Sequence, residues 1–176
     1  MKQVRNKEVI DMCHELKTKC LCFDLNPDNV WDKVDSDTQR MIASTQWHEV
    51  KFIDDLSGEL HSDMTNLPND VGGIYAFVLK PEIIPKTHMY IMYVGRARRT
   101  VTQSLKKRCK EYFTDERPKV LMMKEHWGKY LYIRYLPLND NNIIDKLEVS
   151  LINAILPPCN DSIPDKVIMM AKKAAF

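Results

Sequence analysis

The sequence predicts an α+β fold in which a small, mainly antiparallel sheet of three strands is flanked by helices. Three short runs rich in β-branched, aliphatic and aromatic residues predict the strands, at residues 74–79, 90–94 and 129–137. Residues 80–89 contain two prolines and predict a long hairpin loop between the first two strands. A strongly patterned segment from Asp140 or Asn141 to Leu156, ended by the Pro157-Pro158 pair, predicts a helix after the third strand.

The elements that precede this sheet are predicted to be mostly helical. Residues 7–20 predict an amphipathic helix whose one face carries Val9, Ile10, Cys13, Leu16 and Cys20. A second helix is expected after Ser36, with Met41, Ile42 and Trp47 turned inward. Residues 51–60 predict a short hairpin about Ser57 and Gly58.

A turn-rich segment, "NLPNDVGG" at residues 66–73, marks the predicted boundary between two regions. Residues 1–70 are expected to form an acidic, mostly helical accessory region, and residues 71–176 to form the main domain. Within that domain a helix is expected to begin near residues 100–102 and to carry Leu105, Arg108, Cys109 and Tyr112. In the third strand, Leu131, Ile133 and Tyr135 share one side.

Composition favours a soluble intracellular, cytoplasmic protein. The chain has 176 residues, of which 44% are hydrophobic and 28% charged, which is ordinary for globular domains. No segment approaches the roughly 18 uninterrupted apolar residues of a membrane-spanning helix, so no membrane partner is expected. Five scattered cysteines without C-x-x-C spacing argue against a disulfide framework and against a structural zinc site.

The charge of the chain is unevenly distributed. Residues 1–70 hold 8 basic and 14 acidic side chains, whereas residues 71–176 hold 18 basic and 10 acidic ones. Twelve of the basic side chains lie between Arg96 and Arg134, with four acidic ones. Such a segment can neutralise phosphates of a nucleic acid, or can simply be a solvated surface.

Glu148 lies at an unusual place in the last predicted helix. Helical spacing puts its carboxylate at the edge of the apolar face formed by Ile144, Leu151, Ile152 and Ile155. A carboxylate there needs a cation or strong donors. Two alternatives are open, namely a divalent ion such as magnesium, or an ion pair with Lys146, Arg108 or another base.

Two tyrosines, Tyr75 and Tyr93, lie in the short apolar runs of the predicted strands, and each has a glycine close to it in the sequence. Strand tyrosines usually serve packing. A phenol takes part in proton transfer only when nearby positive charge or hydrogen-bond donors bring its pKa down towards neutrality.

The whole constellation resembles the GIY-YIG nuclease family. "GIY" at residues 73–75 and "YVG" at residues 93–95 are similar to its two signature strands. "LKKRCKEYF" at residues 105–113 is similar to the family's first helix, and "LEVSLINAILPPCN" at residues 147–160 is similar to its glutamate helix and the loop that follows. The resemblance covers about residues 71–160, and its five matching positions occur in the family's order: Tyr75, Tyr93, Arg108, Glu148 and Asn160.

This resemblance implies an active site for phosphodiester hydrolysis. It implies that Glu148 holds one divalent ion per site, Mg²⁺ or Mn²⁺. Tyr75 would act as general base or position the attacking water, Tyr93 would bind the water or phosphate and lower the pKa of its neighbour, and Arg108 would contact the phosphate. Further implied site residues are Tyr112 one helical turn after Arg108, Asn160 as the residue that pins the loop, and the DNA-binding cations Arg96, Arg98, Arg99, Lys106 and Lys107.

The expected function is a divalent-metal-dependent endonuclease that acts on DNA, of the restriction or phage-defence type. A restriction enzyme with one active site per chain is expected to form a dimer, such as a homodimer, or a higher oligomer. The alternatives are a structure-specific repair or recombination nuclease, a catalytically silent nucleic-acid-binding module, and an RNA nuclease, because backbone contacts alone do not distinguish the sugars. Two departures from compact family members are the long loop before Tyr90 and about five inserted residues before Leu105. Such insertions cost little in folding free energy.

Overall fold

A computed structural model describes residues 36–80 and 90–175 of the chain, with side chains described as far as residue 170. The helix expected at residues 7–20, the loop expected at residues 81–89, and Cys13, Cys20 and Cys22 lie outside the described residues. Among the described helices, none combines the length and the apolar character that crossing a membrane requires.

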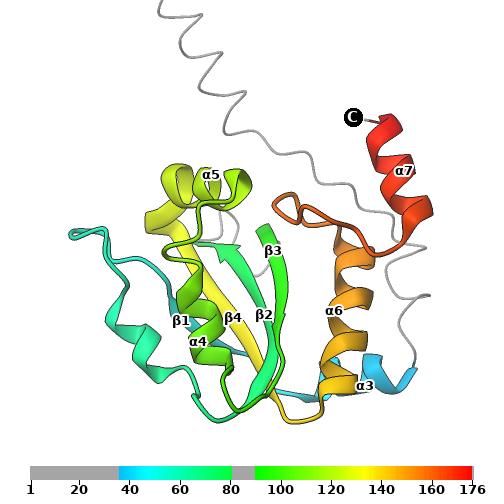
Figure 1. Ribbon diagram of the computed structural model, residues 1–176, viewed down its shortest axis with the longest axis horizontal. Helices are drawn as coiled ribbons and strands as arrows, with labels where there is room; N and C mark the ends of the chain where they lie inside the picture. Colours follow the sequence, from blue (N-terminus) through cyan, green and yellow to red (C-terminus); the bar gives the residue numbers. More distant parts are fainter. Residues whose placement is uncertain (1–35, 81–89, 176) are drawn as a thin grey trace, which may run out of the picture.

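The centre of the fold is a four-stranded antiparallel sheet in the order β1-β4-β2-β3 (Figure 1). Its strands are β1 (His48–Lys51), β2 (Gly72–Leu79), β3 (Tyr90–Ala97) and β4 (Leu131–Leu138). The α+β class with an antiparallel sheet is confirmed, but the predicted number of three strands is wrong. The strand missed is β1, whose sequence HEVK buries only Val50 and therefore lacks an apolar run.

The sheet is covered on both faces (Figure 1). One face packs against α4 (Leu105–Glu111) and α5 (Pro118–Trp127), with Phe52, Phe77 and Ile133 in its core. The other face packs against α6 (Asn141–Ile155) and α3 (Ser36–Ser44), with Ile74 and Leu147 in its core. Burial on both faces explains why β2 is a continuous apolar run.

The three helices predicted within the described residues are found, and one of them begins later than predicted. Helix α3 begins at Ser36 as expected, and α6 begins after Asp140, whose carboxylate caps it by accepting a hydrogen bond from Asn142 N at 2.8 Å. Helix α4 begins at Leu105, not at residues 100–102. Ser104 caps α4 by accepting from Lys107 N, whereas Thr100 Oγ1 accepts from Gln103 N at 2.9 Å and closes a turn before it.

Several elements have no counterpart among the sequence predictions. They are helices α5 and α7 (Lys166–Ala175) and two short 3₁₀ helices, η1 (Ser62–Asn66) and η2 (Gly128–Tyr130). The hairpin expected about Ser57 and Gly58 is present as a turn closed by a single β-bridge between Ile53 and Leu60.

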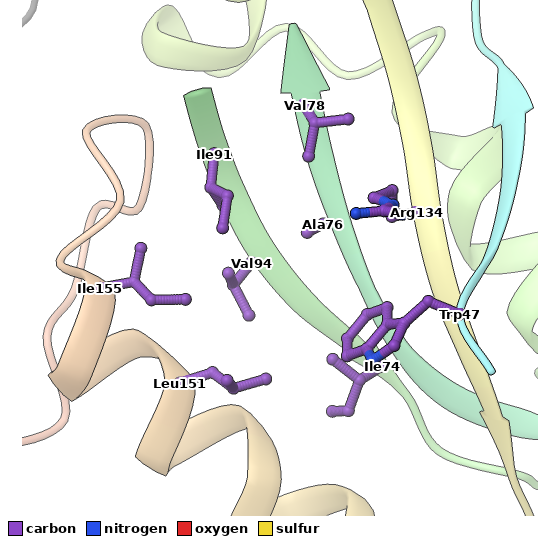
Figure 2. A pocket seen from close by; sticks show the side chains of 9 residues that line it. All are labelled: Trp47, Ile74, Ala76, Val78, Ile91, Val94, Arg134, Leu151 and Ile155. Atoms are coloured by element: carbon purple, nitrogen blue, oxygen red, sulfur yellow. The ribbon is translucent and has the colours of Figure 1, made fainter. Parts of the chain in front are cut away.

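An apolar hollow of about 160 Å³ lies between α6 and the sheet (Figure 2). The side chains that line it come from β2, β3, β4, α6 and the segment after α3: Trp47, Ile74, Ala76, Val78, Ile91, Val94, Arg134, Leu151 and Ile155. Arg134 Nε lies 3.5 Å from Glu49 Oε2, so the one charged side chain of the lining has a counter-ion. The hollow is on the opposite face of the sheet from Tyr75 and Phe77, which belong to the α4 and α5 layer.

Candidate functional site

Three tyrosines form a cluster between the sheet and α4. Tyr75 from β2 and Tyr93 from β3 point to this face, and Tyr112 follows the last turn of α4. The hydroxyls of Tyr75 and Tyr112 are 2.9 Å apart and share a hydrogen bond. Ring centroids of Tyr112 lie 5.7 Å from those of Tyr75 and 5.3 Å from those of Tyr93, in edge-to-face contacts. Three phenols are therefore held together by packing as well as by hydrogen bonding.

Gly95 makes room for this cluster. It lies opposite Tyr75 in the β2–β3 register. A Cβ atom at residue 95 would lie 2.6 Å from the Tyr75 hydroxyl and 2.8 Å from the ring of Tyr93, both too close for a real contact. The glycine of "YVG" is thus required by the close approach of two phenol rings to the strand.

Burial keeps the phenols of Tyr75 and Tyr112 neutral. Tyr75 has no exposed surface, and burial raises its pKa well above the usual value, with further contributions from Tyr112, Cys109 and Tyr93. The pKa of Tyr112 is also raised, mainly by burial. The expectation that Tyr93 lowers the pKa of its neighbour is therefore wrong, because Tyr93 raises it. In the free protein Tyr75 is a neutral phenol that can donate and accept hydrogen bonds.

Arg108 lies over the tyrosine cluster. Its guanidinium carbon is 5.3 Å from the ring centroid of Tyr112, a cation–π distance, and its Nη1 donates to Glu111 Oε2 at 2.8 Å. Burial opposes the charge of Arg108, but Tyr75 and Glu111 outweigh this effect and raise its pKa. The side chain is 38% exposed, so a permanently charged guanidinium is accessible from solvent beside the phenols.

Glu148 has a counter-ion, and it is Arg96. Of the alternatives that the sequence left open, neither Lys146 nor Arg108 makes the direct contact: Arg96 Nη1 lies 2.7 Å from Glu148 Oε2. Asp145, one helical turn earlier, contacts Arg96 Nε at 3.3 Å and Arg98 Nη2 at 2.6 Å. Burial raises the pKa of Glu148 despite the opposing effect of Arg96, and Asp145 raises it further.

The tyrosine cluster and the Arg96–Glu148 pair lie on opposite faces of the same edge strand. Side chains alternate along β3, so Tyr93 and Gly95 face α4 whereas Val94 and Arg96 face α6. The backbone N–H of Arg96 also donates to Glu148, which puts this carboxylate at the strand edge. The positive charge of Arg108 acts on Glu148 from the other side and lowers its pKa. The phenols with Arg108 and the Arg96–Glu148 pair thus lie on either side of residues 93–96 of the edge strand.

Asn160 fixes the loop after α6 to the same strand. Its Oδ1 accepts from Val94 N at 2.9 Å and its Nδ2 donates to Val94 O at 2.8 Å, and the side chain is buried. Cys159 N adds a backbone hydrogen bond to Met92 O at 2.9 Å. Asn160 therefore holds the loop after α6 against β3.

The acidic pair Asp145 and Glu148 fits a small divalent cation. Both supply hard oxygen atoms from one face of α6, and Asp145 Oδ1 is buried without a hydrogen bond. Within the described part of the chain, no group of three or more His, Cys, Asp or Glu side chains could hold a metal. An ion at Glu148 would therefore complete its coordination with water and substrate oxygens. Magnesium is commonly coordinated in this way in proteins.

The other cations expected to bind DNA divide into two groups. Arg98 pairs with Asp145 and Arg99 Nη1 lies 3.4 Å from Asn139 Oδ1, both near the start of α6. Lys106 and Lys107 donate to backbone oxygens of Thr65 and Thr102, at 2.7 Å each. The first group is contiguous with Arg96, whereas the two lysines lie on α4, near η1.

Sequence reasoning missed two charged residues that lie against these groups. Asp145 had a detectable signal, because it precedes Glu148 by one helical turn on the same side of α6. Arg117 had none: it comes from the segment before α5, and only the tertiary fold brings its guanidinium carbon to 5.6 Å from the ring centroid of Tyr112.

Comparisons with known proteins give solved structures of low identity and no sequence relative. No family model matches the chain, and no curated protein matches it in sequence. Solved structures similar to this chain include three tyrosine-to-phenylalanine point mutants of the GIY-YIG N-terminal endonuclease domain of UvrC from Thermotoga maritima, each bound to its catalytic divalent cation. They are 18–19% identical to this chain with TM-scores of 0.39–0.40, and the similarity covers 57–58% of this chain and 99–100% of each endonuclease domain.

Proposed function

We propose that this chain is a divalent-metal-dependent endonuclease that hydrolyses phosphodiester bonds of DNA. The observation that carries the proposal is the placement of neutral phenols, an accessible guanidinium and a partly buried carboxylate on either side of residues 93–96 of one strand. Each of these groups has a use in phosphoryl transfer. The order of Tyr75, Tyr93, Arg108, Glu148 and Asn160 along the sequence, which resembles the GIY-YIG pattern, supports the same function.

In this proposal Tyr75 and Arg108 have separate roles in hydrolysis. Tyr75 orients the attacking water, because its phenol is neutral and hydrogen-bonded to Tyr112. Arg108 donates to the non-bridging phosphate oxygens, where negative charge accumulates. The new bond joins phosphorus to the water oxygen and the broken bond frees the leaving oxygen, which gains one of the two water protons.

Glu148, with Asp145 beside it, would hold one Mg²⁺ or Mn²⁺. When bound, such an ion polarises the phosphate and stabilises charge on the leaving oxygen. Arg96 must give up its contact with Glu148 for this to happen, and it then adds positive charge near the phosphate.

A nuclease assay tests this function. Duplex, single-stranded and branched DNA and an RNA of the same sequence are incubated with the full chain and Mg²⁺. We expect cleavage of DNA, and a loss of at least about a hundredfold in Glu148→Ala and in Arg108→Ala. Arg40→Ala, which removes an exposed cation of α3, is the matched control and should retain full activity. Full activity of Glu148→Ala would show that the site is not the one proposed.

Among DNA endonucleases we favour the restriction or phage-defence type. An enzyme with one such site per chain cuts both strands of a duplex most simply as a dimer. Light scattering with and without DNA checks this, and a monomer under both conditions would favour a repair or recombination nuclease that cuts one strand.

A further inference from the structure

Arg117 lies against the tyrosine cluster without having been assigned any part in the site. Its guanidinium carbon is 5.6 Å from the ring centroid of Tyr112 and 6.0 Å from that of Tyr93. Arg108 lies 5.3 Å from the same Tyr112 ring. Two guanidinium groups, from the body of α4 and from the segment before α5, thus share one aromatic platform.

The guanidinium of Arg117 is held by the carboxylate of Asp115 and by a hydrogen bond with the side chain of Tyr112. Its Nε and Nη2 donate to Asp115 Oδ2 at 2.9 and 2.7 Å, which fixes the plane of the guanidinium. Its Nη1 lies 4.0 Å from Asp161 Oδ2, beyond hydrogen-bonding distance. With a side chain that is 42% exposed, Arg117 is accessible to an oxygen ligand.

The guanidinium of Arg108 has the same kind of surroundings as that of Arg117. Glu111 accepts from its Nη1 at 2.8 Å while the guanidinium lies over Tyr112, and the side chain is 38% exposed. Each arginine has one carboxylate that orients it and one shared ring that supports it. An ordinary surface ion pair needs no such support from a buried tyrosine.

The position of Arg117 is also coupled to the loop that Asn160 holds. Lys119, in the first turn of α5, donates from Nζ to Asn160 O at 3.2 Å and lies 3.7 Å from Asp161 Oδ1. Asn160 is in turn bound to both backbone groups of Val94, next to Tyr93. The start of α5 is therefore tied to β3, and Arg117 is fixed relative to the tyrosines.

We propose that Arg117 is a second phosphate-contacting residue, which binds the DNA backbone next to the phosphate contacted by Arg108. The inference rests on the proposed nuclease function and adds a residue to its substrate-binding surface. A partly exposed guanidinium whose plane is fixed suits a phosphate oxygen better than a flexible ammonium does. The path of the cleaved strand then crosses the edge of β3 and continues towards the start of α5.

Binding as a function of salt tests this role. The anisotropy of a fluorescein-labelled DNA duplex is measured with the full chain in EDTA, so that no cleavage occurs, at several salt concentrations. Arg117→Ala should weaken binding about tenfold at low salt and reduce the slope of log Kd against log salt by about one. Arg117→Lys keeps the charge and should retain the slope. Arg40→Ala, an equal loss of charge on α3, should change neither quantity.

Several results of this experiment would contradict a phosphate contact at Arg117. If Arg117→Ala has the slope and affinity of Arg40→Ala while Arg108→Ala weakens binding, Arg117 makes no phosphate contact. If Arg117→Ala changes the pH profile of cleavage and leaves the salt slope intact, it acts on the phenols and the inference is wrong. Should Arg117→Ala fail to fold, Arg117→Gln retains the stem over the rings and is measured instead. A wild-type chain that neither binds nor cuts DNA would instead overturn the proposed function.

Discussion

The guanidinium of Arg96 lies 2.7 Å from the carboxylate of Glu148, across the boundary between strand β3 and helix α6. The glutamate is only 20% exposed, and burial raises its pKa although Arg96 acts to lower it. The ion pair therefore compensates only part of the cost of burying the charge. The proposed function accounts for this cost, because a metal ion would need Glu148 ionised.

Glu148→Gln should keep or raise the thermal stability of the chain while it abolishes metal-dependent cleavage. Glutamine imitates the protonated acid, and the raised pKa means that the folded state disfavours the ionised form more than the unfolded state does. Thermal unfolding at neutral pH and a plasmid cleavage assay measure the two effects. Glu59→Gln, at an exposed position, is the control and should change neither. A lower unfolding midpoint in Glu148→Gln would show that the ion pair is worth more than the burial costs.

The same raised pKa predicts how stability depends on pH. Between the unfolded value of about 4.3 and the higher folded value, the folded state binds more protons at Glu148 than the unfolded state does. Stability of the wild-type chain therefore falls as pH rises through this window. The advantage of Glu148→Gln should be absent below pH of about 4 and reach its full size above the folded pKa. An advantage that grows as pH falls would contradict the raised pKa.

Arg96→Ala should bind Mn²⁺ more tightly than wild type in the absence of DNA. The guanidinium occupies the carboxylate that the ion needs, so its removal takes away a competitor. We expect a gain of about two- to fivefold in affinity, the size of a partly exposed ion pair. Electron paramagnetic resonance of free Mn²⁺ measures the binding without any need for cleavage.

Arg99→Ala is the matched control for this measurement. Arg99 Nη1 lies 3.4 Å from the amide oxygen of Asn139, whereas the direct guanidinium partner of Glu148 is Arg96. Both variants lose one positive charge at the start of α6, so the general electrostatic gain is shared. Equal Mn²⁺ affinities in the two variants would mean that Arg96 does not compete for the ion.

Tyr75→Phe should reduce cleavage by about a hundredfold or more with little change of fold. The substitution removes the hydroxyl that lies 2.9 Å from Tyr112 and leaves the ring in place. Loss of that hydrogen bond should lower the free energy of unfolding by about 1 kcal/mol. Tyr130→Phe, at a partly exposed position, is the control. Cleavage at the wild-type rate in Tyr75→Phe would leave the phenol with a packing role alone.

The sequence predicted those parts of the fold whose signals are local. Strand β2 is visible as an apolar run because both its faces are buried, and α6 is visible because Asp140 caps it and prolines follow it. Strand β1 is invisible because it is four residues long and mostly polar. Its place in the sheet depends on pairing with β4, which no local pattern records.

The candidate site was also only partly predictable from the sequence. The type and order of its residues could be read from the sequence, but their partners could not. Arg96 meets Glu148 only because side chains alternate along β3 and α6 packs on that face. The pKa of Tyr75 was misjudged because nearby arginines were expected to dominate, whereas complete burial does.

Asn160→Asp should destabilise the chain more than a surface substitution, and should reduce cleavage through the loop rather than through the reacting groups. Aspartate keeps the oxygen that accepts from Val94 N but replaces the Nδ2 donor, so a carboxylate oxygen would face the carbonyl of Val94. Because the side chain is buried, we expect a loss of about 1–3 kcal/mol in the free energy of unfolding. Urea unfolding measures it, with the neighbouring Asp161→Asn as the exposed control. Since protonation of the new carboxylate restores a donor, the deficit should shrink as pH falls below the pKa of that group, and a deficit independent of pH would show that Asn160 acts by its shape and not by its hydrogen bonds.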